Sequence, residues 1–163
     1  TVNIDPSAED LADIALMAAE EARRWKMTPR VALLSYSNFG SSKHPNARKM
    51  RNAVQLIREK DPSLMVDGEM NADLAIMPKI QKEHYPFSQL QGSANVLIFP
   101  DLQSGNISYK LVHRLSGAEA IGPILVGMEK PVHILQVGST SVQDVANMTA
   151  IAVVDAQEQA KKG

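Results

Sequence analysis

The sequence predicts an α/β fold, a layered αβα sandwich with a mostly parallel sheet. Segments with helical periodicity alternate along the chain with short apolar segments, which is typical of layered α/β domains. Residues 30–36 are almost continuously apolar, as expected of a strand buried on both faces of a parallel sheet. The chain has 163 residues and no internal repeat or Gly/Ser-rich linker. We therefore expect a single α/β unit over residues 1–163.

The first helix is expected between Ser7 and Trp25, and a strand follows over residues 30–36. Ser7 is a suitable N-cap, and Glu9 and Asp10 place negative charge in the first turn. The residues expected on the apolar face recur at helical spacing: Leu11, Ile14, Ala15, Ala18, Ala22 and Trp25. A proline, Pro29, ends the helical pattern before the strand begins.

The next segments predict a helix over residues 46–60 and a short strand over 64–66. Residues 69–92 are the hardest to assign, because Pro78 interrupts the helical pattern of residues 71–83. The remaining expected elements are a strand over 95–99, a helix over 105–115, strands over 120–125 and 132–135, and a helix over 142–160. The total is about five strands and four or five helices.

The composition excludes several classes of function. A net charge of −1 gives no overall attraction to nucleic acid, and no apolar run reaches the roughly 18 residues of a membrane span. The chain has no cysteine, so disulfides, thiolate metal sites and a cysteine nucleophile are excluded, in agreement with a cytoplasmic location. The four histidines lack metal-ligand spacing, so no metal is expected. Thr1 in place of Met favours a processed or excised piece.

The loops that follow strands are the candidate sites, because open α/β sheets bind ligands at the carboxyl ends of their strands. The first such loop, residues 35–44, carries Ser37, Gly40 and Ser41 ahead of a helix. Backbone N–H groups and the helix dipole would suit an anion there. The alternative is that these residues only turn the loop and cap the helix.

The second loop leads from residue 99 into a helix and combines small polar residues with cations. Ser104 and Asn106 could surround an oxyanion at the helix start. Lys110 and Arg114 lie four residues apart and share a helical face, and Tyr109 adds a donor. A phosphate-bearing ligand would match this set. The alternative is a capped surface helix with solvated basic residues.

The third loop, residues 135–144, ends in Asp144 at a strand–helix junction. Asp144 could act as a general base or bind a hydroxyl or amide of a ligand. The alternative is structural, because Ser141 and Asp144 have capping-box spacing and could simply close the helix N-terminus.

Two long motifs now carry a family resemblance. Residues 99–110 follow the pattern FPDLxSGNxxYK, and residues 114–132 contain RxxGAxAIGPILxG followed by KPV. These motifs closely resemble the phosphate acetyl/butyryltransferase family, and residues 7–15 and 31–37 look similar upstream. The resemblance covers nearly the whole chain but only the carboxyl-terminal half of the family's domain. It implies a phosphotransacetylase-like αβα fold.

Two further segments, residues 37–41 and 147–157, resemble the acyltransferase-like domain at the end of bacterial multidomain NADP-dependent malic enzymes. That resemblance implies acetyl-CoA as an effector. NADP and a divalent metal would belong to the malic-enzyme domain of the same parent chain, and this fragment itself would need no cofactor. The apolar final helix could also pack against a symmetry mate, so a homo-oligomer with a dimer formed through this domain is expected.

The third loop departs from the family pattern. Active members are expected to carry Leu-Ser-Arg-Gly, then three residues, then Asp-Asp-Ile-Val. Here Gln136 and Val137 replace the serine and arginine, and Gln143 replaces the first aspartate, while Asp144 matches the catalytic one. Losing a guanidinium that binds phosphate and stabilises developing charge costs on the order of 10²-fold or more in rate.

Together these features imply a non-catalytic, acetyl-CoA-binding regulatory domain of an NADP-dependent malic enzyme, which converts malate to pyruvate and CO₂. The expected ligand-binding residues are Ser37, Ser41, Ser104, Asn106, Tyr109, Lys110, Arg114 and Asp144. The alternative is an active phosphate acetyltransferase in which Asp144 deprotonates the CoA thiol, and a third possibility is an oligomerisation module. Neither nucleic acid nor a membrane is expected as a partner.

Overall fold

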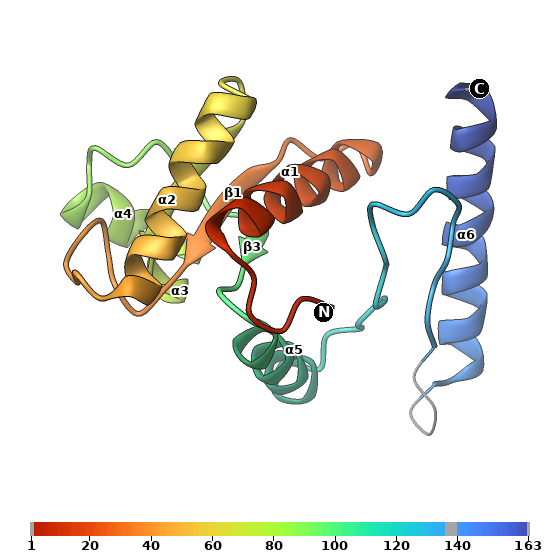
Figure 1. Cartoon of the computed structure of the whole chain (residues 1–163). Helices are drawn as coiled ribbons and strands as arrows, with labels where there is room; N and C mark the ends of the chain where they lie inside the picture. Colours follow the sequence, from red (N-terminus) through yellow and green to blue (C-terminus); the bar gives the residue numbers. More distant parts are fainter. Residues whose placement is uncertain (1, 136–139, 163) are drawn as a thin grey trace. The chain divides into compact units, whose positions relative to one another are not determined.

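The computed structural model describes residues 2–135 and 140–162. The elements in chain order are α1 (Ala8–Arg24), β1 (Arg30–Leu34), α2 (Pro45–Lys60), β2 (Met65–Met70), α3 (Ala72–Ile76), α4 (Pro78–His84), β3 (Val96–Ile98), α5 (Leu102–Ser116) and α6 (Val142–Lys162) (Figure 1). The chain divides into two compact units, Thr1–Ser108 and Tyr109–Gly163, with the boundary inside α5. The expected single unit over residues 1–163 stays a prediction.

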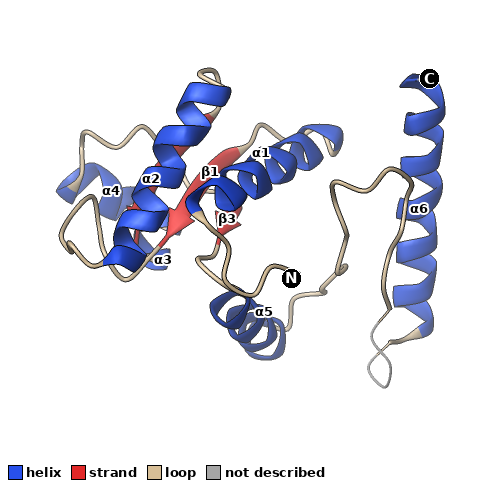
Figure 2. Ribbon diagram, viewed as in Figure 1, coloured by secondary structure: helices blue, strands red, loops and turns tan. Residues whose placement is uncertain are grey.

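The first unit is built on a three-stranded sheet of order β2-β1-β3 (Figure 2). Both neighbours pair with the central β1 in parallel. The register against β2 is regular from Arg30 to Leu33 and then shifts, so that Leu33 pairs with Gly68 and Leu34 with Met70. Glu69 is thereby left between two paired positions, which is the arrangement of a β-bulge.

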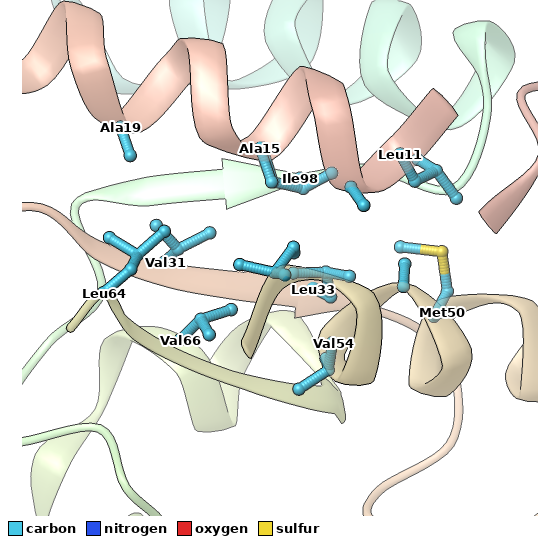
Figure 3. Packing of buried hydrophobic residues seen from close by; sticks show 13 residues of the cluster. Leu11, Ala15, Ala19, Val31, Leu33, Met50, Val54, Leu64, Val66 and Ile98 are labelled. Atoms are coloured by element: carbon cyan, nitrogen blue, oxygen red, sulfur yellow. The ribbon is translucent and has the colours of Figure 1, made fainter. Parts of the chain in front are cut away.

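Helices α1 and α2 cover one face of this sheet (Figure 3). Side chains of β1 on this face, Val31 and Leu33, are fully buried, as expected where successive strand residues point to opposite faces. The helices contribute a row of small and medium apolar residues to the same cluster: Leu11, Ala15 and Ala19 from α1, and Met50, Val54 and Ile57 from α2. The alanines allow α1 to approach the sheet closely.

The opposite face of the sheet forms a second cluster. Ala32 and Leu34, the alternate residues of β1, pack there with Leu74 and Ala75 of α3 and with Met70. Because apolar layers cover both faces of β1, the unit is a helix–sheet–helix sandwich, and the predicted α/β fold with a parallel sheet is confirmed.

Several predicted elements agree with the structure. Ser7 caps α1 through a complete capping box, with its hydroxyl accepting from the Asp10 N–H and the Asp10 carboxylate accepting from the Ser7 N–H. Helix α2 and strand β1 also lie within a few residues of their expected bounds. Trp25, however, is not on the apolar face: it is the exposed C-cap of α1, and its indole N–H donates to Glu21.

Other predictions were wrong. The segments 120–125 and 132–135 are not strands, because their only described pairing is a single antiparallel bridge between Ile124 and His133. Pro123 removes a backbone donor from the middle of the first segment, so a continuous ladder cannot form through it. The described part of the chain therefore has a three-stranded sheet rather than about five strands. The interruption expected at Pro78 is confirmed, because the helical pattern of residues 71–83 is divided there into α3 and α4. A search of the described residues finds no helix with the length and apolar character to cross a bilayer.

Candidate ligand site

A polar cavity of about 560 Å³ lies within the second unit. Four of its lining residues come from α5, which projects Tyr109, Lys110, His113 and Arg114 toward it. The rest come from the connecting segment and the first turn of α6: Glu119, Ala120, Gly122, Leu135, Thr140, Ser141, Gln143 and Asp144. Four of the eight residues expected to bind ligand, Tyr109, Lys110, Arg114 and Asp144, are thus brought to one cavity.

Helix α5 positions its cations because of its own local structure. The Asp101 carboxylate accepts from the Ser104 N–H at 2.7 Å, and the Ser104 hydroxyl donates to the Asp101 carbonyl at 3.1 Å. The backbone bond from Ser104 lowers the pKa of Asp101, which keeps a negative charge at the start of the helix. Two turns later, Lys110 and Arg114 lie on one face, and the Tyr109 ring stacks on His113 at 6.1 Å and 17°.

Asp144 is held by the N-terminus of α6. Its carboxylate accepts from the Ser141 N–H at 2.7 Å and from the Ser141 hydroxyl at 2.8 Å, and its own N–H donates to that hydroxyl at 3.1 Å. The backbone bond from Ser141 and then the hydroxyl bond lower the pKa of Asp144; burial opposes them, and the nearby charge of His113 adds a weaker lowering. The structure therefore confirms that Ser141 and Asp144 form a capping box at the start of α6. Asp144 also lines the cavity.

The loop after β1 is organised around a buried carboxylate that sequence reasoning missed. Glu69 is fully buried, and its Oε1 accepts from the Ser37 hydroxyl at 2.7 Å and from the Gly40 N–H at 2.9 Å. Arg51 binds it with two further hydrogen bonds of 2.8 and 2.9 Å. Ser41 lies in the same cluster, 3.1 Å from the Ser37 hydroxyl. The hydroxyls of Ser37 and Ser41 thus shape this loop.

The electrostatics of the buried cluster favour the charged form of both partners. Burial alone would raise the pKa of Glu69, but the hydrogen bonds from Arg51, Ser37 and Gly40 together outweigh it and lower that pKa. The hydrogen bonds to Glu69 in turn raise the pKa of Arg51. A sequence signal existed, because Asp67 and Glu69 are two carboxylates between the apolar residues Val66 and Met70, and carboxylates in an apolar strand demand cationic partners.

The family model described as phosphate acetyl/butaryl transferase matches residues 1–153. This chain belongs to that family. It is 51% identical over 160 residues to the NADP-dependent malic enzyme of Escherichia coli (strain K12), aligning 97% of this chain with 21% of that protein, in its carboxyl-terminal region. It is also 46% identical over 157 residues to the phosphate acetyltransferase of Clostridium acetobutylicum, covering 96% of this chain and 47% of that protein.

Solved structures of the family share the fold. The EutD phosphotransacetylase from Staphylococcus aureus superimposes with a TM-score of 0.87 at 38% identity, over 98% of this chain and 48% of that one. The phosphotransacetylase from Streptococcus pyogenes gives a TM-score of 0.88 at 40% identity. The chain therefore spans about half the length of the phosphate acetyltransferases it matches and about a fifth of the malic enzymes.

In this chain the predicted site residues fall into three places. Ser37 and Ser41 lie in the Glu69 cluster, Ser104 and Asn106 lie in the first turns of α5, and the other four line the cavity. Gln136 and Val137, where the chain departs from the family pattern, lie outside the described residues. That all eight form one ligand site stays a prediction.

His113 and Glu119 line the cavity but were not predicted. No group of three potential metal ligands occurs among the residues with described positions.

Replacing Ser141 with alanine is expected to raise the pKa of Asp144 toward its ordinary value. The substitution removes the hydroxyl that both donates to the carboxylate and accepts from the Asp144 N–H. NMR titration of the Asp144 carboxyl carbon measures the change. Thr149→Ala is the matched control, since that hydroxyl donates to the Val145 carbonyl one turn further along α6. An Asp144 that titrates at the same pH in Ser141→Ala and wild type would contradict the assigned role of Ser141.

Proposed function

We propose that this chain is a non-catalytic regulatory domain that binds acetyl-CoA and belongs to an NADP-dependent malic enzyme, which oxidatively decarboxylates malate to pyruvate. The identity to malic enzymes of several bacteria supports the choice of parent. NADP and the divalent metal of that reaction would be held by parts of the parent outside these residues. Acetyl-CoA would act by linkage, binding one state of the parent more tightly and so shifting its activity.

The observation that carries the proposal is the chemistry of the cavity in the second unit. Lys110 and Arg114 supply two cationic side chains on one helical face, which suit the phosphates of CoA. The volume of about 560 Å³ falls within the roughly 300–1,000 Å³ of small-molecule sites. The described part of the site therefore contains the cationic side chains that an anionic ligand needs.

The same cavity supplies a poor base for acyl transfer. A catalyst would use Asp144 to take the proton of the CoA thiol, whose ordinary pKa is about 8.5. The hydrogen bonds from Ser141 move the pKa of Asp144 in the opposite direction, which widens the mismatch between base and acid. Lys110 and Arg114 can bind the ligand, whereas the Asp144 carboxylate is engaged in capping α6. This combination favours binding of the ligand over catalysis.

The second candidate function is an active phosphate acetyltransferase, which transfers acetyl between CoA and phosphate. The identity of 46–49% to phosphate acetyltransferases of Clostridium acetobutylicum and Paracoccus denitrificans favours it. In that case Asp144 would be the base, and Lys110 and Tyr109 would hold phosphate. Release of CoA from acetyl-CoA and phosphate distinguishes the two functions, since an enzyme of ordinary efficiency turns over at ~1–10³ s⁻¹.

Calorimetric titration with acetyl-CoA tests the regulatory function, using the full natural length of the chain that carries these residues. Wild type is expected to bind, without acetyl transfer at enzymatic rates. Lys110→Ala is expected to weaken binding by about tenfold, because a charge-assisted contact to phosphate is lost. Lys130→Ala, an exposed lysine of the same unit that does not line the cavity, should leave binding unchanged. Absence of binding at millimolar acetyl-CoA would contradict the proposed function.

We also propose that the parent is a cytoplasmic homo-oligomer with a dimer contact through this domain. Helix α6 supports this with exposed apolar side chains, including Val142, Val145, Val153 and Val154. Sedimentation with and without acetyl-CoA measures the assembly, and a pure oligomerisation module should ignore the ligand. A monomer at all concentrations would contradict the contact.

A further inference from the structure

Glu119 is held at the cavity of the second unit by a relay of two side-chain amides. The amide nitrogen of Gln143 donates to the side-chain oxygen of Asn147 at 2.9 Å, and the amide nitrogen of Asn147 donates to a Glu119 carboxylate oxygen at 3.1 Å. Gln143 and Asn147 are four residues apart on α6, so they are neighbours on the helix surface. Glu119 and Gln143 line the cavity, whereas Asn147 does not.

The direction of this relay follows from the carboxylate at its end. A carboxylate only accepts hydrogen bonds, so Asn147 must turn its nitrogen toward Glu119 and its oxygen toward Gln143. Gln143 must then present its own nitrogen to that oxygen. The three side chains therefore have one mutually satisfied arrangement, and it ties Glu119 of the connecting segment to α6.

The presence of Glu119 is unexpected in a cavity that suits an anion. Lys110 and Arg114 line the same cavity, but neither forms an ion pair with Glu119 in the part of the chain that the structure describes. Asn147 is the one described residue that bonds its carboxylate. Because a carboxylate has about four lone-pair sites, Glu119 can accept further hydrogen bonds from a ligand. It also repels the phosphates that the two cations attract.

We propose that Glu119 is a specificity-determining residue whose carboxylate accepts a hydrogen bond from an N–H group of an acyl-CoA and disfavours acyl phosphates. An acyl-CoA combines phosphates with the amide N–H groups of its pantetheine arm and the amino group of its adenine. An acyl phosphate carries negative charge but no N–H group, so Glu119 only repels it. This inference rests on the proposed binding of acetyl-CoA and names the residue that selects this class of ligand.

The two classes of ligand should respond to the loss of Glu119 in opposite directions. Glu119→Ala removes a charged hydrogen-bond acceptor, so we expect acetyl-CoA to bind about tenfold more weakly. The same substitution removes a negative charge, so we expect acetyl phosphate to bind about two- to fivefold more tightly after screening by salt. If Glu119 served only to tie the connecting segment to α6, its loss would change both affinities in the same direction.

The experiment measures both affinities by calorimetry at constant pH, in the full natural length of the chain that carries these residues. Acetyl-CoA is titrated directly, and acetyl phosphate is titrated in competition with it. Glu119→Gln is the second variant, because it keeps the shape of the side chain and an oxygen for Asn147 while removing the charge. It should change the two affinities in the same directions as Glu119→Ala. Thermal melting of each variant shows whether it is folded.

Acetyl phosphopantetheine identifies which N–H group of the ligand binds Glu119, because it has the amide groups and a phosphate but no adenine. Weaker binding of this probe to Glu119→Ala assigns the contact to the pantetheine arm. A loss confined to acetyl-CoA assigns it to the adenine amino group.

Asn147 should act through Glu119, since it does not line the cavity. Asn147→Ala is expected to weaken acetyl-CoA binding by about threefold, because Glu119 loses the bond that positions it. In a chain that already carries Glu119→Ala, the same substitution should have no further effect. Equal effects of Asn147→Ala with and without Glu119 would overturn this positioning role.

Glu129→Ala is the matched control, because Glu129 is an exposed glutamate of the same connecting segment that does not line the cavity. It should leave both affinities unchanged. A Glu119→Ala protein that binds acetyl-CoA as wild type does, or that binds both ligands more weakly, would overturn the role of Glu119 while leaving the binding function standing. A lack of acetyl-CoA binding in wild type and in the Glu129 control would overturn the proposed function and this inference together.

Discussion

Replacing Arg51 with methionine is expected to destabilise the first unit by about 3–5 kcal/mol. Glu69 is fully buried, and Arg51 supplies the charge and the two hydrogen bonds that make its burial tolerable. Methionine fills similar space but leaves the carboxylate without a cationic partner, with neutral donors that include the Ser37 hydroxyl and the Gly40 N–H. The Ser42 carbonyl, which Arg51 also binds at 3.2 Å, loses that donor.

Urea denaturation followed by fluorescence measures this loss, because the single tryptophan, Trp25, lies in the first unit. Arg23→Met is the matched control. Arg23 pairs with Asp61 at 3.1 Å, with 45% of its side chain exposed, and such surface pairs contribute about 0–1 kcal/mol. Equal losses in the two variants would show that Glu69 does not depend on Arg51.

The destabilisation by Arg51→Met should shrink on acidification. In wild type the pKa of folded Glu69 lies below its unfolded value of about 4.3, so its stabilisation is complete above that pH and is lost as pH falls through the folded pKa. Without Arg51, burial dominates and raises the pKa of Glu69. The variant then neutralises its buried charge by about pH 4, whereas wild type does not. A difference between the two proteins that is constant from pH 7 to pH 4 would contradict this account.

Replacing Gly68 with alanine is expected to cost on the order of 3–5 kcal/mol. Gly68 has a φ of +142°, a conformation that residues with a side chain rarely adopt. An added Cβ would lie 2.7 Å from the Leu33 carbonyl oxygen and 3.1 Å from the Leu33 Cβ in the neighbouring strand. Since Leu33 is in the central strand and fully buried, neither atom can move away without opening the sheet.

Gly92→Ala separates the cost of the backbone conformation from the cost of the close contact with Leu33. Gly92 has a φ of +103°, but an added Cβ there would meet no atom within 4 Å, so only the backbone conformation is penalised, by about 1–2 kcal/mol. The difference between the two free energies of unfolding, measured in urea, is the contribution of the close approach of β2 to β1. Similar losses in both variants would show that β1 and β2 tolerate the extra carbon.

The Gly68 result also bears on the candidate site. The register shift after Leu33 places Glu69 outside the regular pairing, and its carboxylate there receives the donors of the loop that holds Ser37 and Ser41. A variant that removes this bulge should therefore also alter the loop.

The local sequence was sufficient to predict most elements of the first unit. Ser7 and Asp10 predicted the start of α1, and the continuous apolar run from Val31 to Leu34 predicted a strand covered on both faces. These features depend on residues within about one helical turn or one strand, so they are readable without knowing what packs against them. The capping role of Ser141 and Asp144 was readable for the same reason.

Contacts between distant residues could not be read in this way. The pairing of Glu69 with Arg51, 18 residues apart, depends on a β-bulge whose position is set by the register of two strands. The apolar segments 120–125 and 132–135 looked like strands, but an apolar run becomes a strand only where a neighbour satisfies its backbone, and the described ladder there is a single bridge. The sequence by itself determined the fold class, the caps and the cations of α5. Only the tertiary structure decided that Asp144 lines one cavity with those cations and that Glu69 organises the serine loop, because both depend on which distant segments meet.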